Sequence, residues 1–377
     1  MKGYAQNPPP TIVIDAERIP LACPGVPFRA CGGIGITSGG DIFYGVDRSI
    51  FMYASRDGGR SFDRGDIEIP GITPIQPQMS TPGLGINIGF GVAPDDALLR
   101  LYLKKEPDSL FARLWCARSE DEGRTWDPGS KLDTTGFKCH PGQEATSFMA
   151  HPDGAVSVIL DLRYGEDCIH DVDGNALAQE HKGLFQFLYR SRDGGRTWPE
   201  RDLLMRHGAE SSTLHLGGKK MMAAIRYQRW FDEPDDPPDL RESMGMDANG
   251  EVIYKHLFLA DSEDDGRTWQ DLRPLTWHGA CPGELVKLSD DRIVVIYNVR
   301  YPHEKAHVRA QVSSDGGRTW SADHYLISSG DGYPSSVVLP DDTIVTMTGC
   351  TQLNAVGKPL EAINMNAVRW KVPQEQS

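Results

Sequence analysis

An eight-residue motif that recurs five times constrains the fold of this chain more than any other feature. Its common form is Ser-x-Asp-x-Gly-x-Thr-Trp, with one Ser-Phe ending, and the copies occupy residues 55–62, 119–126, 191–198, 262–269 and 313–320. The Asp can accept hydrogen bonds from turn N–H groups, the Gly permits a positive φ, and Thr-Trp begins a strand, so each copy favours a β-hairpin. Five copies at intervals of 64, 72, 71 and 51 residues indicate a repeat architecture.

Six pairs of short apolar strands form a second repeat, superimposed on the first. Their tight turns fall near residues 40, 95, 153, 217, 290 and 341. Alternating apolar residues and hairpin turns predict antiparallel strands, and four strands per unit are typical of a propeller blade. We therefore predict an all-β fold, a six-bladed β-propeller with the hairpin motif on five blades. We expect a single domain over residues 1–377, with blades from about residue 11 to 371 between short flexible termini.

The N-terminal segment and the polar insertions complete this prediction. We expect residues 11–15, Thr-Ile-Val-Ile-Asp, to pair with the last blade and close the ring, because closure removes exposed sheet edges. The sixth blade ends in a strand at residues 363–370 instead of a hairpin motif. The polar stretches 165–183 and 232–250 are expected to be loops at the rim.

Charge and cysteine content exclude several classes of partner. A net charge of −14 argues against nucleic acid, which needs a basic surface, although a local arginine cluster can still bind an anion. Seven Cys without a Cys-x-x-Cys pair predict reduced thiols, and neither a disulfide framework nor a zinc site. The N-terminus lacks an apolar signal-like region and no apolar run reaches membrane-spanning length. We expect a cytoplasmic protein without a membrane partner; a secreted or periplasmic protein that has lost its signal peptide would look the same.

Charged and aromatic residues recur at the ends of the apolar strand pairs, where propeller blades meet at one mouth of the central axis. The position after the second strand carries Asp47 with Arg48, then Arg163, Arg226 and Arg300. The position before the first strand carries Arg29, Glu144, Glu210, Glu284 and Tyr333. Equivalent corners of different blades converge on the same space. These side chains are therefore predicted to line a shared pocket, unless their recurrence reflects only a shared folding role.

The eight-residue motif resembles the Asp-box (BNR) repeat of the sialidase superfamily. In that family the repeat lies on the outer rim, away from the catalytic centre, so the resemblance assigns the Asp and Trp residues of the motif to folding. The corner residues are also similar to the family's catalytic layout. Arg29 resembles the first of three substrate-binding arginines, and Glu210 with Arg226 resembles the catalytic Glu and the second arginine. Tyr333, within Gly-Tyr-Pro-Ser-Ser, resembles the catalytic Tyr.

The remaining positions of that layout have more than one candidate. Glu284 with Arg300 repeats the spacing of Glu210 with Arg226, so either Glu fits the catalytic position. Arg300 is also the candidate for the third arginine, with Arg309 as its substitute, and Asp47 is the candidate acid. The match is incomplete, because Phe-Arg-Ala-Cys stands where the family has Arg-Ile-Pro and the loop at Asp47 is short.

The resemblance implies a glycoside hydrolase similar to an exo-sialidase, acting on an anionic carbohydrate without a metal or other cofactor. Three guanidinium groups hold a substrate carboxylate through bidentate hydrogen bonds that Lys cannot reproduce. A Tyr oxygen beside a Glu base can attack an anomeric carbon that carries a carboxylate, where a carboxylate nucleophile would be repelled. An Asp or Glu acid then protonates the leaving oxygen.

Two alternatives stay open. A uronate-directed lyase or rhamnosidase-type propeller would use His and Tyr for proton transfer, and a His precedes three of the corner Glu residues at His140, His207 and His278. A non-catalytic sugar-binding propeller would keep the arginines and lack an acid, which the short loop at Asp47 allows. The sequence predicts neither the sugar nor the oligomeric state.

Overall fold

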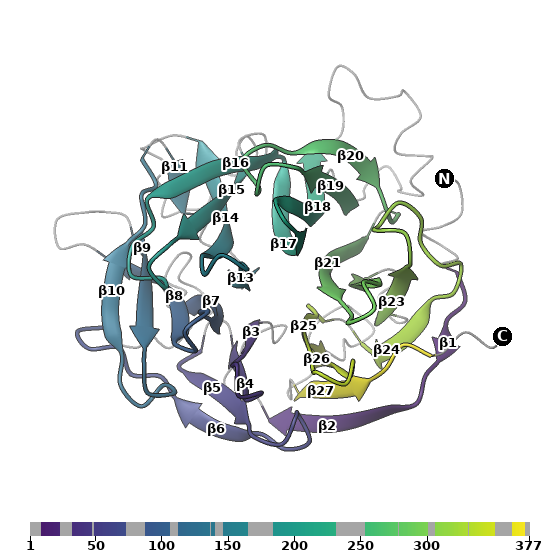
Figure 1. Ribbon diagram of the computed structural model, residues 1–377, viewed down its shortest axis with the longest axis horizontal. Helices are drawn as coiled ribbons and strands as arrows, with labels where there is room; N and C mark the ends of the chain where they lie inside the picture. The colour runs from purple at the N-terminus through teal and green to yellow at the C-terminus, as the bar shows by residue number, and fades with distance from the viewer. Residues whose placement is uncertain are drawn as a thin grey trace.

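The computed structural model describes residues 9–22, 32–46, 49–72, 87–105, 112–135, 137–139, 146–164, 184–230, 253–277, 279–300, 306–330, 332–350 and 364–373. Within these ranges the chain forms 27 strands, and no helix in them is long and apolar enough to cross a membrane. The strands form six sheets that are arranged around a central axis as a six-bladed β-propeller (Figure 1). This confirms the fold predicted from the sequence.

The first three blades follow one another along the chain. Blade 1 consists of β3 (Gly32–Ile36), β4 (Ile42–Val46), β5 (Phe51–Ser55) and β6 (Asp63–Asp66). Blade 2 consists of β7 (Asn87–Val92), β8 (Leu98–Lys105), β9 (Ala112–Ser119) and β10 (Asp127–Lys131), with β12 (Thr146–Ser147) parallel to β7. Blade 3 consists of β13 (Met149–Ala150), β14 (Val156–Tyr164), β15 (Leu184–Ser191) and β16 (Glu200–Arg206), and β11 (Phe137–Cys139) also pairs with β14.

The other three blades complete the ring, and the chain's N-terminal segment contributes to two of them. Blade 4 consists of β17 (Gly208–Gly217), β18 (Lys220–Trp230), β19 (Ile253–Ser262) and β20 (Gln270–Pro274). Blade 5 consists of β21 (Ala280–Lys287), β22 (Ile293–Val299), β23 (His307–Ser313) and β24 (Tyr325–Ser329), with β1 (Ile12–Val13) added in parallel. Blade 6 consists of β25 (Ser335–Val338), β26 (Ile344–Cys350), β27 (Asn364–Trp370) and β2 (Ala16–Ala22).

The ring is closed by a different stretch of the N-terminal segment from the one predicted. The expectation that residues 11–15 pair with the last blade is wrong, because Ile12 and Val13 pair with β24 of blade 5. The closing strand is β2, which runs antiparallel to β27 from Ala16 opposite Trp370 to Ala22 opposite Asn364. As the edge strand of its sheet, β2 tolerates Pro20, which would remove a hydrogen bond from a central strand.

The hydrophobic core is divided into six clusters, one at each boundary between neighbouring blades. Strand β22 shows how one strand serves two clusters. Val294 and Ile296 pack toward blade 6, whereas Val295 and Tyr297 pack toward blade 4. Because successive side chains of a strand point to opposite faces, each blade buries both faces against its neighbours. The central axis is therefore the place where strand ends from several blades can meet.

The five Asp-box hairpins join the third and fourth strands of blades 1 to 5, as predicted. In the hairpin that follows β9, the Asp121 carboxylate accepts hydrogen bonds from Thr125 N (2.8 Å) and Thr125 Oγ1 (2.6 Å). These bonds lower the pKa of Asp121 to about 2. Gly123 has a φ of +86° and donates its N–H to Ser119 Oγ at 2.8 Å. The motif residues are thus occupied by turn geometry, which fits the folding role that the resemblance assigns to them.

Arginines connect four of these hairpins to the preceding blade of the ring. In each case an arginine side chain donates a hydrogen bond to a backbone carbonyl of the hairpin: Arg118 to Gly194 O, Arg190 to Asp265 O, Arg273 to Gly317 O and Arg369 to Gly58 O. The last of these bonds, from Arg369 Nε at 2.7 Å, runs from blade 6 to blade 1 across the closure. Polar contacts at the hairpin edge therefore reinforce the apolar packing between blades.

Candidate functional site

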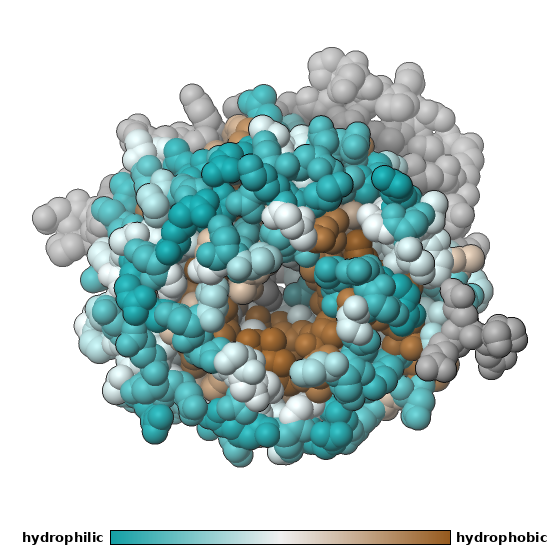
Figure 2. All heavy atoms as spheres, viewed as in Figure 1, coloured by the Kyte–Doolittle hydropathy of each residue, from teal (hydrophilic) through white to brown (hydrophobic). Residues whose placement is uncertain are grey.

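A small cavity lies where the first strands of blades 1, 4, 5 and 6 approach the central axis. Its volume is about 40 Å³, and its lining includes Glu210, Glu284, Tyr333 and backbone or small side chains at Gly32, Ser211, Ser212, Pro282, Gly283, Pro334 and Ser335. The first strands β3, β17, β21 and β25 lie nearest the centre of the ring, and the surface is hollowed there, whereas hydrophilic residues cover the outer rim (Figures 1 and 2). We call this space the hub cavity.

Glu210 enters the hub cavity from an irregular part of β17. The register between β17 and β18 shifts between Ala209 and Ser212, and Glu210 has a φ of +44°. A left-handed conformation is unfavourable for a residue with a side chain, so it persists only where surrounding contacts hold it. The irregularity turns Glu210 toward the axis, as bulges next to functional sites often do.

A buried network from blade 3 holds this conformation. Asp161 on β14 accepts a hydrogen bond from Glu210 N at its Oδ2 (3.1 Å) and one from Gln186 Nε2 at its Oδ1 (2.7 Å). Gln186 Oε1 in turn accepts from Ser211 Oγ at 2.6 Å. Asp161, Gln186 and Ser211 are all buried. The neighbouring blade therefore fixes the backbone on both sides of the Glu210 Cα.

Arg226 connects Glu210 to Tyr333. It lies on β18, opposite Ala209, and forms an ion pair with the Glu210 carboxylate through Nη1. The same Nη1 lies 3.4 Å from Tyr333 Oη, and Nη2 donates to Gln228 Oε1 at 2.5 Å. Because the Arg226 side chain is buried, these contacts are only weakly screened by water. A fixed cation thus lies between a carboxylate and a phenol.

Blade 5 supplies the second Glu–Arg pair of the hub. Glu284 on β21 is buried and lines the hub cavity, and Arg300 follows directly after β22. The Arg300 Cζ lies 5.7 Å from the centroid of the Tyr333 ring, within the range of a cation–π contact. Arg300 Nη1 is buried and has no hydrogen-bond partner among the described residues. A buried donor in this state is suited to bind an oxygen atom of a ligand.

The structure thus brings together five of the ten residues predicted for the site, namely Glu210, Arg226, Glu284, Arg300 and Tyr333. They come from blades 4, 5 and 6: Glu210, Arg226 and Glu284 lie within β17, β18 and β21, Arg300 follows β22, and Tyr333 precedes β25. The described part of the site combines two guanidinium groups, two carboxylates and one phenol. That set can bind oxygen atoms, transfer a proton and supply a nucleophile.

The other predicted residues are not at the hub cavity or lie outside the described residues. Arg309 lies within β23, the third strand of its blade; it donates to Pro9 O (3.0 Å) and His307 Nε2 (2.9 Å) and packs over Trp277. A residue in the middle of a third strand is remote from the axis, so the structure does not support Arg309 as a substitute for Arg300. Arg163 is on β14, and only its backbone is described. Arg29, Asp47 and Arg48 lie outside the described residues, as do Glu144, His140 and His278.

Two residues that support Glu210 were not among those predicted from the sequence. Asp161 and Gln186 interrupt the otherwise apolar runs Val-Ile-Leu-Asp-Leu and Leu-Phe-Gln-Phe-Leu. A buried polar residue must be hydrogen-bonded, so an Asp or Gln inside a strand that is apolar on both faces is itself a signal of a specific polar contact. His207, which the lyase alternative uses, packs its ring against Tyr227 with 6.1 Å between centroids.

Comparisons with known proteins identify the repeat and the fold. The BNR/Asp-box repeat family matches residues 311–322, which contain the whole fifth copy of the motif at residues 313–320. No curated protein matches the chain. Among solved structures, an alpha-L-arabinanase of Penicillium chrysogenum has a TM-score of 0.60 at 12% identity, over 95% of this chain and 98% of its own. An alpha-L-arabinofuranosidase of Fusarium graminearum has a TM-score of 0.60 at 11% identity, over 94% and 97%. The Hadza microbial sialidase Hz136 has a TM-score of 0.58 at 15% identity, over 93% and 68%.

Proposed function

We propose that this protein is a glycoside hydrolase and that the hub cavity is its active site. The observation that carries the proposal is the convergence of Glu210, Glu284 and Tyr333 from three blades on one cavity, beside Arg226 and Arg300. The names of the structural neighbours support it, because proteins of this fold include a sialidase and two arabinose-releasing or arabinan-directed enzymes. The fold alone would not suffice, since one fold hosts many functions.

The first candidate substrate is an anionic sugar, as for a sialidase. In this chemistry the Tyr333 oxygen attacks the anomeric carbon while the glycosidic C–O bond breaks, a Glu accepts the phenol proton, and an acid protonates the leaving oxygen. Water then attacks the tyrosyl intermediate and releases the sugar and Tyr333. Arg300 would bind the substrate carboxylate together with Arg226 and with Arg29, which lies outside the described residues. Asp47 remains the proposed acid.

The second candidate is a neutral sugar, and the charge balance of the hub cavity favours it. Arg226 is already paired with Glu210, so the described groups carry as many carboxylates as guanidinium groups. In this chemistry one carboxyl group protonates the leaving oxygen and the other acts as nucleophile or as base toward water, and Tyr333 only contacts the substrate. The arabinan-directed neighbours make an α-L-arabinofuranoside the first neutral substrate to test.

Hydrolysis of two chromogenic substrates tests the proposal and separates the candidates. The purified chain is assayed on an aryl α-sialoside and on an aryl α-L-arabinofuranoside, with the variants Tyr333→Phe and Glu284→Gln. Removing the nucleophile or the acid/base group is expected to lower kcat by about 10²–10⁴-fold. Loss in Tyr333→Phe on the sialoside supports the first candidate; loss in Glu284→Gln with activity retained in Tyr333→Phe supports the second.

The remaining outcomes would contradict the hydrolase proposal. A product that absorbs in the ultraviolet, formed from a uronate polysaccharide without uptake of water, would identify a lyase. Saturable sugar binding with no product would identify a sugar-binding propeller. Equal activity of the wild type and both variants would place the chemistry outside the hub cavity.

A further inference from the structure

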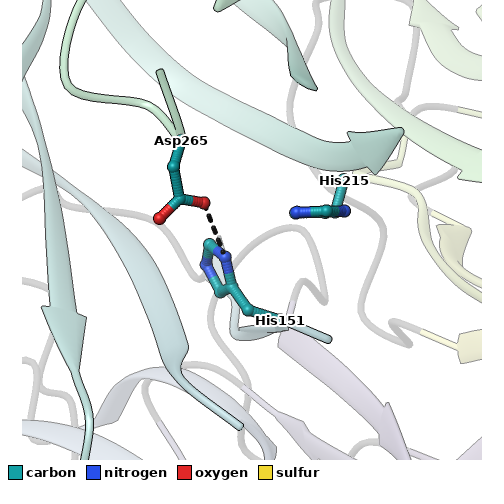
Figure 3. Close-up of side chains that lie close together, drawn as sticks. All are labelled: His151, His215 and Asp265. Carbon is teal, nitrogen blue, oxygen red and sulfur yellow. Dashed lines mark ion pairs between the residues drawn. The ribbon is translucent and has the colours of Figure 1, made fainter. Parts of the chain in front are cut away.

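A second cluster of reactive side chains lies on the opposite edge of the sheets, at the boundary between blades 3 and 4. His151 follows β13, His215 lies near the end of β17, and Asp265 belongs to the hairpin after β19 (Figure 3). One donor atom from each of the three lies within 4.8 Å of the others. His215 is five positions along β17 from Glu210, roughly 15 Å away at strand geometry, so this cluster is separate from the hub cavity. We propose that it binds one divalent transition-metal ion, with Zn²⁺ as the best candidate.

His151 is prepared as a metal ligand. Its side chain is 1% exposed, and its Nε2 makes a 2.8 Å hydrogen bond with Ser157 Oγ. Such a bond to the distal nitrogen is the arrangement that orients a metal-binding imidazole. Its Nδ1 points toward Asp265, and no group in the described part of the chain forms a hydrogen bond with it.

The distance between His151 and Asp265 fits a tetrahedral site. His151 Nδ1 and Asp265 Oδ1 are 3.3 Å apart. Two donors at about 2.0–2.1 Å from a tetrahedral zinc ion stand roughly 3.4 Å from each other, so a metal fits between these atoms without movement. His215 approaches from the other side, with a ring nitrogen directed at the pair (Figure 3).

His215 needs only a small adjustment. The donor atoms of the three residues lie up to 4.8 Å apart, whereas donors of a tetrahedral zinc ion lie roughly 3.4 Å apart. The His215 ring therefore has to move toward the other two residues by roughly 1–1.5 Å to complete the site. Its Nδ1 accepts a hydrogen bond from Gly217 N at 3.1 Å, at an exposed turn. If His215 binds the metal through Nε2, its proton moves to Nδ1, which then no longer accepts from Gly217. The Gly217 N–H would bind water instead, at little cost in an exposed turn.

Asp265 occupies a left-handed hairpin position that three of the other four hairpins fill with glycine. The fourth motif residue is left-handed in all five hairpins, and it is Gly in three of them, at Gly58, Gly194 and Gly316. Asp265 has a φ of +66° there, a conformation that Asp tolerates better than most residues with a side chain. The turn leaves this carboxylate outside its own hydrogen bonds, and its two oxygens face Arg190 and His151.

The charges around the cluster also favour a divalent cation. Two guanidinium groups interact there with four carboxylates; the groups are Arg190 and Arg192 with Asp153, Glu200, Asp202 and Asp265. This leaves an excess of two negative charges, which one divalent ion would balance. Two imidazoles with one carboxylate suit zinc, copper or nickel, whereas calcium and magnesium prefer oxygen ligands only. A metal here would connect blade 3 to blade 4 and stabilise their boundary.

Zinc binding to the full chain tests the proposal with readouts that need no catalytic activity. Equilibrium dialysis followed by elemental analysis measures stoichiometry, and thermal unfolding measures the gain in stability. The wild type is expected to bind one zinc ion per chain, and its Tm to rise by roughly 3 °C at a hundredfold excess over Kd. Chelation should reverse the rise, and calcium should not produce it.

Three variants make the test specific. His215→Ala and Asp265→Asn each remove one ligand; Asn adopts a left-handed φ readily, so the second variant keeps the hairpin. Both are expected to weaken zinc binding by at least tenfold and to abolish the rise in Tm. Asp153→Asn is the matched control, because it removes the same charge beside His151 without removing a ligand, and it should weaken zinc binding far less than either ligand variant does. Absence of zinc binding, wild-type affinity in either ligand variant, or an equal response to calcium would overturn the proposal.

Discussion

Asp161→Ala is expected to impair the hub cavity although Asp161 does not line it. The substitution removes the acceptor of the partly buried Glu210 N–H and of the buried Gln186 amide. Without the hydrogen bond to Asp161, the backbone of Glu210 is expected to relax from its φ of +44°. Its carboxylate would then leave the position in which it pairs with Arg226. Asp161 is in this view a positioning residue for Glu210.

The magnitude follows from the bonds that are lost. A buried polar group left without its partner costs about 1–3 kcal/mol, so two such groups cost roughly 2–6 kcal/mol in the free energy of unfolding. For a chain of this length that corresponds to a fall in Tm of about 3–8 °C. A catalytic group displaced by an ångström lowers kcat by about 10²-fold, whereas KM depends on the other substrate contacts and should change less.

Asp161→Asn is the control that separates positioning from simple destabilisation. The amide oxygen that this substitution introduces can still accept the Glu210 N–H. A flip of the Gln186 amide lets the new NH₂ group donate to Gln186 Oε1, while Ser211 Oγ accepts from Gln186 Nε2 at the other end. This variant should recover most of kcat and Tm.

Steady-state kinetics on the hydrolysed aryl glycoside, together with thermal unfolding of the wild type and both variants, gives the comparison. Wild-type kcat in Asp161→Ala, or an equal loss of kcat in both variants, would refute the reasoning.

Three further predictions concern the fold. Hydrogen bonds within the hairpins lower the folded-state pKa of the motif aspartates, to about 2 for Asp264. The stability that these aspartates contribute is therefore present above the ordinary Asp pKa and is lost as pH falls from about 4 toward 2. Tm measured across this pH range should decline accordingly. Gly195→Ala places a Cβ 2.6 Å from Leu99 at a φ of +88°, and should lower the free energy of unfolding, measured with denaturant, by about 2–4 kcal/mol. Gly154→Ala is the control: its φ is similar but the space around it is open, so it should cost only about 1 kcal/mol. Arg369→Ala removes the bond across the ring closure and should cost about 1–2 kcal/mol in the same assay; no change would mean that packing alone closes the ring.

The fold could be predicted because its determinants are local and repeated. Each hairpin is specified within eight residues by Ser, Asp, Gly and Thr, and their bonds are formed as the turn chemistry implies. The closing strand was misplaced because β1 has the more strand-like composition, while β2 contains Pro20 and charged residues. Which of two adjacent segments reaches blade 6 depends on the path around the ring, and composition does not encode that path.

The site could be predicted as far as it follows from the repeat. Glu210 and Glu284 lie on the first strands of blades 4 and 5, and Tyr333 directly precedes the first strand of blade 6, so their convergence follows from the architecture. Arg309 fails this criterion, since it lies inside a third strand. The bulge at Glu210 could not be predicted, because it results from a register shift that Asp161 of another blade stabilises.

The cluster of His151, His215 and Asp265 could not be predicted from the spacing of residues in the sequence, for a similar reason. Its members are separated by 64 and 50 residues, and each belongs to a different hairpin or strand end. Short metal-binding motifs work because two ligands share one turn of helix or one loop. In a propeller, ligands are instead brought together by the packing of one blade on the next, and only the three-dimensional arrangement reveals them.

The hairpin motifs and the proposed active site occupy opposite edges of the same sheets, and this separation has a physical consequence. In blade 4, Ser262 begins the hairpin opposite Met221, whereas Arg226 lies five residues further along β18 at the hub. Left-handed residues other than glycine occur at both edges: Asp96, Glu122, Asp265, Asp291 and Asp342 lie in turns at the hairpin edge, and His207 and Glu210 lie at the hub end of blade 4. Substitutions in the hairpins should therefore change the free energy of unfolding and leave kcat/KM unaffected, whereas substitutions around Glu210 should change both.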